Sequence, residues 1–326
     1  MSICLVTFQA EDKVRHVKVF LAGHNGLVGS AIIREAPATV EIIKVSRSKL
    51  DLVDQSAVYD FIAKEKPDSI ILAAAVVGGI GANSTNQKGF LLENLRIQNS
   101  VLGAASELGI HNFIFLGSSC IYPKFAPQPI QENSILSGPL ELTNEGYAIA
   151  KIAGVRLVQA IADEQNLNYF SLMPTNLYGP NDNFEAFTSH VPAALMRKFH
   201  EAKISNLKQV VVWGTGSPRR EFMHVDDMAR ACWYLLGQNV GGELINIGTG
   251  SDISISDFAN LMARIVGFEG EIIFDLSKPD GTPRKLLDVT KAHALGWKHQ
   301  IELEDGLRQT YSWFVEALDN GGVRGY

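Results

Sequence analysis

The stretch VKVFLAGHNGLVGS, residues 17–30, joins an apolar run to a turn that holds three glycines. The run VKVFLAG has the continuous apolar character of a strand buried on both faces, and a helical segment follows from Ser30. Between them, Gly23, Gly26 and Gly29 form the pattern G-x-x-G-x-x-G. Glycines at these places allow a tight turn, close approach of a pyrophosphate to the backbone, and packing of the helix on the strand. The stretch therefore predicts a dinucleotide site in a βαβ unit.

The same alternation of strand and helix recurs along the first half of the chain. Further apolar strands are predicted at residues 40–46, 69–75, 112–118 and 169–175, with helical segments between them. Continuous apolar strands joined by helical crossovers are typical of a parallel sheet covered on both faces. The expected fold class is α/β, with a Rossmann-like doubly wound sheet.

The end of the second strand bears on the choice of cofactor. Enzymes that prefer NAD usually carry a carboxylate there for the ribose hydroxyls, but this chain reads KVSRSKLDL at residues 44–52. Ser46 and Arg47 suit the 2′-phosphate of NADP, because a guanidinium binds phosphate well. We therefore expect NADP(H) as the cofactor. The alternative is that Arg47 is a solvated surface residue that contacts no phosphate.

The second half of the chain mixes short elements. A helix is predicted near residues 190–203, followed by strands in QVVVWG, INIGTG and EIIFD. These elements fit a smaller C-terminal substrate-binding lobe that is partly interleaved with the sheet. The expected division is an N-terminal extension (1–16), an NADP-binding Rossmann domain with later segments interleaved (17–180), and a mainly substrate-binding lobe (181–326).

Charge and cysteine usage limit the class of protein. The chain has 29 basic and 35 acidic residues, a formal net charge of −6, which gives no general attraction for nucleic acid or anionic lipid. Cys4, Cys120 and Cys232 show no metal-type spacing and are odd in number, so neither a metal site nor a disulfide framework is expected. No stretch approaches the roughly 18 apolar residues of a membrane span. A cytoplasmic protein is expected.

Two groups of reactive side chains follow the predicted strands. In GYAIAK, residues 146–151, Tyr147 and Lys151 are spaced to share one face of a helix. An ammonium beside a phenol is expected to lower the phenol's pKa and so to favour proton transfer. In LGSSCIYPK, residues 116–124, the polar Ser118, Ser119 and Cys120 stand at the carboxyl edge of the sheet, where open α/β folds bind ligands.

These motifs together resemble the extended short-chain dehydrogenases/reductases, which act on nucleotide sugars. Within that family the similarity is to enzymes that epimerise GDP-4-keto-6-deoxy-D-mannose at C3 and C5 and reduce it at C4, yielding GDP-L-fucose. The resemblance covers roughly residues 17–316. It rests on AAAVVGGIGAN, LGSSCIYPK, NEGYAIAKIAG, MPTNLYGPNDNF, REFMHVDDMA and SKPDGTPRKLLDV.

The resemblance implies a role for each matching residue. Ser118 and Tyr147 would hold the C4 oxygen of the sugar, and Lys151 would support the tyrosine and the nicotinamide ribose. Cys120 and His190 would exchange protons at C3 and C5. Taken alone, Cys120 also fits a packing thiol, and His190 a surface or capping histidine.

Binding residues are implied in the same way. The expected cofactor contacts are Gly23, His24, Asn25, Gly26, Leu27, Val28, Gly29, Ser46, Arg47, Leu116, Gly117, Ser118, Ser119, Lys151, Pro174, Thr175, Asn176, Leu177 and His190. The expected substrate contacts are Lys198, Trp213, Arg220 and Asp280. Trp213 also fits a core position, and Lys198 a solvated helix face. The chain is expected to bind a GDP-linked keto-deoxy sugar and to form a homodimer.

The chain departs from the family's pattern at three places. Asn25 and Val45 stand where members often carry basic residues, so the hold on the 2′-phosphate rests on Arg47. Lys198 replaces a frequent arginine, which exchanges a bidentate fork for a point charge. Other readings of the residues are a related nucleotide-sugar 4-reductase, a 4-epimerase, a 4,6-dehydratase, or a non-catalytic NADP-binding sensor.

Overall fold

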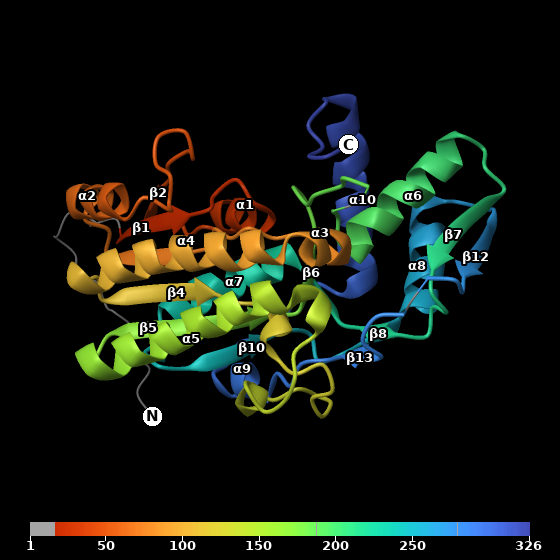
Figure 1. Ribbon diagram of the computed structural model, residues 1–326. Coiled ribbons are helices and arrows are strands. Elements are labelled where there is room, and N and C mark those ends of the chain that lie inside the picture. Colours follow the sequence, from red (N-terminus) through yellow and green to blue (C-terminus); the bar gives the residue numbers. More distant parts are fainter. Residues whose placement is uncertain (1–16, 187, 279) are drawn as a thin grey trace.

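The larger part of the structure is built on a six-stranded parallel sheet (Figure 1). The computed structural model describes residues 17–186, 188–278 and 280–326, so the predicted N-terminal extension and Cys4 lie outside the described residues. The strands are β1 (Val17–Ala22), β2 (Val40–Ile43), β3 (Ser69–Leu72), β4 (Asn112–Leu116), β5 (Asn168–Pro174) and β10 (Leu244–Ile247). Their spatial order is β2-β1-β3-β4-β5-β10, and every neighbouring pair is parallel.

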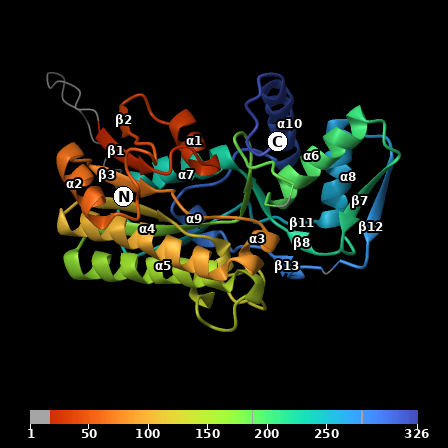
Figure 2. The same ribbon diagram turned by 45° about the horizontal axis from the view of Figure 1, so that its top comes forward.

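Both faces of the sheet are buried, which explains the continuous apolar strands. In β1, Val19 and Leu21 join one apolar cluster, while Phe20 and Ala22 join the cluster on the opposite face. Figure 2 shows helices lying along the two sides of the sheet. The covering helices are α1 (Leu27–Arg34), α7 (Val225–Leu236) and α9 (Thr290–Ala294) on one face, and α2 (Gln55–Glu65), α4 (Gln87–Glu107) and α5 (Glu145–Gln165) on the other. The predicted Rossmann-like α/β fold is confirmed.

The interpretation of INIGTG as part of the smaller lobe was wrong. Its first three residues, Ile245 to Ile247, belong to β10, which pairs with β5 at the edge of the large sheet. All four residues of β10 are buried. The chain therefore returns to the sheet after leaving it at the end of β5.

A second group of elements packs around its own apolar cluster beyond the carboxyl ends of the strands (Figure 1). The helices there are α6 (Val191–Ile204), α8 (Ile255–Val266) and α10 (Leu303–Asp319), whereas α3 (Ile80–Thr85) lies against α4 and the 3₁₀ turn before α5. The strands are β6 (Asn176–Tyr178), β7 (Gln209–Trp213), β8 (Arg219–Arg220), β9 (Phe222–His224), β11 (Ile253–Ser254), β12 (Glu271–Asp275) and β13 (Arg284–Lys285). The short pairing of β13 with β8 brings residues far apart in the chain together.

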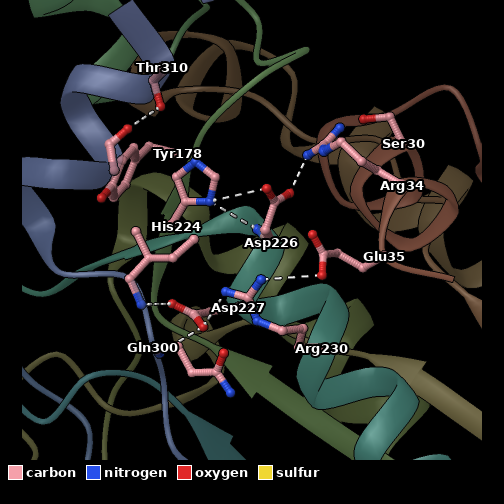
Figure 3. Close-up of polar contacts among 12 residues, drawn as sticks. Ser30, Arg34, Glu35, Tyr178, His224, Asp226, Asp227, Arg230, Gln300 and Thr310 are labelled. Atoms are coloured by element: carbon pink, nitrogen blue, oxygen red, sulfur yellow. Dashed lines mark hydrogen bonds and ion pairs between the residues drawn. The ribbon is translucent and has the colours of Figure 1, made fainter. Parts of the chain in front are cut away.

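A polar network around one buried carboxylate ties the two groups of elements together (Figure 3). Asp227 on α7 is fully buried, and its carboxylate accepts hydrogen bonds from the backbone N–H groups of Gln300 and Ile301 at 2.8 and 2.9 Å. Arg230 donates to Asp227 at 2.8 Å and to Glu35, just beyond α1, at 3.2 Å. The network fixes α7 against both α1 and the chain that leads into α10.

Within the described residues, none of the helices is long and apolar enough to cross a membrane.

Candidate active site

The glycine turn follows β1 and lies beside the end of β3. In the sheet, β2 lies on one side of β1 and β3 on the other, so the strand order changes direction at this point. Gly23 has φ of +98°, and a Cβ there would lie 2.5 Å from the backbone nitrogen of Ala74. A Cβ on Gly29 would lie 2.1 Å from the carbonyl oxygen of Gly23, so helix α1 can pack here only on glycine. Gly26 differs, because a Cβ would meet only the Gly23 oxygen at 3.6 Å. Space beside the middle glycine is what a pyrophosphate needs.

Gly26 is also the N-cap of α1, and no side chain caps that end. The first N–H groups of the helix are therefore directed at the place a phosphate would take, and they fit an anion there. The predicted contacts Leu27 and Val28 are partly buried and pack against the core beneath the turn. These residues fit a dinucleotide cofactor.

A pocket beside this turn suits the adenosine end of the cofactor. Its lining includes His24, Asn25 and Arg47 among the predicted contacts. Burial lowers the pKa of His24, and the charge of Lys44 lowers it further. The predicted Ser46 does not line the pocket and shares a 3.0 Å hydrogen bond with Ser48. Among the lining residues that were not predicted are Asp51, Leu52, Val53 and Glu93, although the first three lie only five to seven residues beyond the predicted second strand.

Ser118 and Tyr147 come together at the carboxyl end of β4. Ser118 caps a short 3₁₀ turn, Ser119–Ile121, and its hydroxyl accepts a 3.2 Å hydrogen bond from the Cys120 N–H. A side-chain hydrogen bond links Ser118 to Tyr147. Burial raises the pKa of Tyr147, Cys120 raises it further, and the bond with Ser118 acts in the opposite direction. Tyr147 is therefore protonated at neutral pH, which is the form that donates a proton.

The predicted placement of Tyr147 and Lys151 on one helix face is correct, but the expected pKa of the tyrosine was wrong. The Lys151 Nζ lies 5.9 Å from the centre of the Tyr147 ring and 4.7 Å from that of Phe115. It also donates to the Leu116 carbonyl at 2.7 Å. Because Lys151 is only 3% exposed, burial lowers its pKa to about 7. Lys151 is therefore only partly protonated at neutral pH. Its effect on the pKa of Tyr147 does not outweigh the effect of burying the phenol.

Cys120 has two side-chain donors around its sulfur. The Asn144 Nδ2 lies 3.3 Å and the Lys285 Nζ 3.5 Å from Sγ. An ammonium and an amide therefore flank a half-buried sulfur. Cys232 contrasts with it, because it is fully buried and its pKa is raised by burial.

His190 is the N-cap of α6 and has an exposed surface. Loss of solvent around its ring lowers the pKa of His190, and the charge of Lys285 lowers it further. The same lysine therefore acts on both proposed proton-exchanging residues. Both effects favour the neutral imidazole at neutral pH.

The remaining predicted cofactor contacts lie on two turns after β4 and β5. Gly117 donates its N–H to the Leu172 carbonyl at 2.9 Å, and Ser119 is buried beside it. Thr175 and Asn176 both donate side-chain hydrogen bonds to the Glu221 carbonyl, at 3.1 and 2.8 Å. Those two side chains fix the junction of β5, which ends at Pro174, with β6, which contains Leu177, so they face the protein instead of a ligand.

The predicted substrate residues lie in the second group of elements. Trp213 at the end of β7 is 66% exposed, which excludes the core alternative, and the Lys278 Nζ stands 5.4 Å from its ring centre. Lys198 on α6 donates to the Val211 carbonyl at 2.7 Å, beside the same strand. Asp280 accepts two hydrogen bonds from Thr215.

Arg220 completes this set. Burial lowers the pKa of its guanidinium, and the charge of Asp280 acts in the opposite direction. Aromatic and cationic side chains of this kind suit a nucleoside diphosphate, with the base on the ring and the phosphates on the cations.

On the substrate side of the site, the polar residues Asn144, Lys278 and Lys285 were not predicted. Two of them stand in the quoted stretch SKPDGTPRKLLDV, but no periodicity marks them. Among the described residues, no group of three or more His, Cys, Asp or Glu side chains is placed to hold a metal ion.

The sheet, the glycine turn and the Ser–Tyr–Lys group define an oxidoreductase of the nucleotide-sugar type. Residues 19–248 match the model of the NAD dependent epimerase/dehydratase family. The chain is 53% identical to Putative GDP-L-fucose synthase 2 of Arabidopsis thaliana, over 93% of both chains. It is 51% identical to GDP-L-fucose synthase of Escherichia coli, over 93% of this chain and 98% of that one.

A solved structure shows the same likeness. A GDP-L-fucose synthetase from Naegleria fowleri bound to NADP superposes with a TM-score of 0.85 at 26% identity, over 95% of this chain and 96% of that one. The chain therefore belongs to the NAD dependent epimerase/dehydratase family, within the GDP-L-fucose synthases.

Proposed function

We propose that this chain converts GDP-4-keto-6-deoxy-D-mannose into GDP-L-fucose, by epimerisation at C3 and C5 and reduction at C4 with NADPH. The observation that carries this proposal is the position of the Cys120 sulfur. It is contacted by the side-chain donors of Asn144 and Lys285 and lies near the hydrogen-bonded side chains of Ser118 and Tyr147. A plain 4-reductase needs the serine and tyrosine. A thiol supported by an ammonium adds the means to exchange protons on carbon.

The epimerisation depends on the ketone. Hydrogens at C3 and C5 are acidic only because C4 carries a carbonyl, and hydroxyl donors aimed at that oxygen stabilise the enolate. Ser118 and Tyr147 are those donors. Cys120 removes the proton, and His190 returns one from the other face of the sugar.

NADPH supplies the hydride for C4. Tyr147 gives the proton to the C4 oxygen, and its raised pKa keeps that proton available in the resting enzyme. Lys151 stands beside the phenol and would meet the nicotinamide ribose. The NADP-bound relative and the position of Arg47 in the adenosine pocket support NADPH as the cofactor.

The two parts of the chain divide the binding. Residues 17–180 hold the cofactor, and residues 181–326 mainly hold the GDP-sugar. Lys198 and Arg220 meet the diphosphate, and Trp213 stacks on the base. The relatives named for GDP-L-fucose synthesis support a GDP-linked substrate.

Solvent deuterium tests the proposal. In deuterium oxide, the intact enzyme should oxidise NADPH with GDP-4-keto-6-deoxy-D-mannose and place deuterium at C3 and C5 of the product. Cys120→Ser should incorporate little, because a hydroxyl is a far weaker base than a thiolate. NADPH affinity, measured by fluorescence titration, is the control and should not change.

The possible outcomes are distinct. Normal deuterium incorporation by Cys120→Ser would make the thiol a packing residue. Reduction by the intact enzyme without incorporation would identify a plain 4-reductase. No NADPH oxidation at all would exclude the proposed substrate.

We also propose that the enzyme works as a homodimer in the cytoplasm. Cys120 and Cys232 are free thiols, and the cytoplasm keeps thiols reduced. The helices α4 and α5 expose the apolar side chains of Leu92 and Ile149, which a second copy would cover. Light scattering of the purified protein measures the oligomeric state.

A further inference from the structure

The segment that follows α10 turns back and binds the chain next to His190. The Phe184 N–H donates to the Arg324 carbonyl at 2.9 Å. Arg197 on α6 donates from one nitrogen, Nη1, to the carbonyls of both Phe184 and Gly325, at 2.8 and 3.0 Å. Its guanidinium also lies 4.7 Å from the centre of the Tyr326 ring. Arg197 thus links α6 to the backbone at Phe184 and to the last residues after α10, Gly325 and Tyr326.

The contact is tight at Gly325. Its φ is +78°, a conformation that favours glycine, and a Cβ there would lie 2.6 Å from Asn183 Oδ1 and 2.7 Å from the Glu185 backbone nitrogen. A side chain at this position would push the segment away from the chain it touches. Gly322 is a useful comparison, because a Cβ there would meet only the Ala317 oxygen at 3.6 Å.

Hydrogen bonds continue from this contact to His190. Asn183 donates from Nδ2 to Thr188 Oγ1 at 2.8 Å and accepts the Glu185 N–H at 3.2 Å. The Glu185 carboxylate accepts the Thr188 N–H at 2.8 Å, and its carbonyl accepts the Ser189 N–H at 3.0 Å. The next residue is His190, whose carbonyl starts helix α6.

A buried carboxylate lies at the same contact. Asp182 is 3% exposed, and its Oδ1 accepts the Asn183 N–H at 2.7 Å. The other oxygen, Oδ2, has no hydrogen-bond partner within the described residues. Arg324 is the cation whose charge acts on it. The segment thus contributes backbone contacts, ring packing and a compensating charge to the chain that carries His190.

We infer that Arg324, Gly325 and Tyr326 are positioning residues for the proton transfer by His190. They hold the chain before His190 and the first turns of α6 in one arrangement, and so fix the imidazole relative to the sugar. This inference rests on the proposed function, in which His190 returns a proton to carbon. A misplacement of about 1 Å in such a group can cost on the order of 100-fold in rate.

The test separates proton exchange from hydride transfer. Gly325→Ala should lower solvent deuterium incorporation at C3 and C5 at least tenfold. A single turnover of GDP-L-fucose with NADP⁺, which removes hydride from C4 without inversion at C3 or C5, should stay within about twofold of the intact enzyme. Gly322→Ala is the matched control and should leave both rates unchanged.

Arg197→Lys is a second variant that weakens the same contact, and it is needed in case Gly325→Ala does not fold. It keeps the positive charge beside Glu201 but loses the arginine nitrogen that bridges two carbonyls, and it should show the same selective loss. Equal losses in both assays, or no loss in either, for the folded variants would overturn the inference. His190→Asn is measured alongside, because normal exchange by that variant would refute the role of His190 in the proposed function instead.

Discussion

Asp182→Asn should change how the stability of this enzyme depends on pH. Burial raises the pKa of Asp182 to about 7, although the Asn183 N–H and the charge of Arg324 act to lower it. The folded protein therefore holds this proton more tightly than the unfolded chain does, in which an aspartate has its ordinary pKa of 3.8. Stability from this group is present at low pH and is lost as pH rises through about 7.

The size of the effect follows from the two pKa values. The rise from 3.8 to about 7 is about 3 pH units, and each unit corresponds to about 1.4 kcal/mol, so the group changes the free energy of unfolding by about 4 kcal/mol. An asparagine does not titrate. The difference in unfolding free energy between Asp182→Asn and the intact protein should therefore shift by about 4 kcal/mol in favour of the variant between pH 4 and pH 8.

Urea unfolding of both proteins at several pH values measures this difference, because the contributions of other titrating groups cancel. Asp252→Asn supplies a control of opposite sign. Although burial acts to raise the pKa of Asp252, hydrogen bonds from Arg284 and Arg219 lower it. The stability from that carboxylate is present at neutral pH and is lost as pH falls. Parallel curves for Asp182→Asn and the intact protein would refute the reasoning.

Two further predictions concern the reaction and the cofactor. Tyr147→Phe keeps the ring but removes the proton, so kcat should fall roughly 10²- to 10⁴-fold with little change in NADPH affinity, and near-normal turnover would remove the tyrosine from the mechanism. Asn25→Arg should increase the ratio of kcat/KM for NADPH to that for NADH by adding a cation at the 2′-phosphate, while Arg47→Ala should decrease it; a ratio that neither change moves would place the 2′-phosphate elsewhere.

The sequence predicted those features of the fold that depend on local pattern. The apolar strands, the glycine turn and the shared face of Tyr147 and Lys151 follow from residue spacing alone, because each is set by neighbours in the chain. The direction of the Tyr147 pKa did not follow. It depends on how deeply α5 buries the phenol and the ammonium, and helix periodicity carries no measure of that depth.

Lys285 was missed because its contact with the site is long-range. Lys285 reaches Cys120 across 165 positions of sequence, through the pairing of two-residue strands. Pairings so short leave no alternation or apolar run to detect. The contact of Gly325 with Asn183 has the same character, since a glycine near the end of a chain predicts no particular partner.

The late return of β10 to the sheet has a consequence for how the chain can be divided. A fragment that stopped near residue 180 would contain five of the six sheet strands but would leave the edge of β5 unpaired. A long apolar strand with free N–H and C=O groups is prone to pair with other chains. During synthesis the sheet cannot close until residues 244–247 have left the ribosome, so β5 stays open while some seventy further residues are made. Expression of the first 180 residues alone should therefore yield aggregate, and a soluble cofactor-binding fragment would have to include α7 and β10.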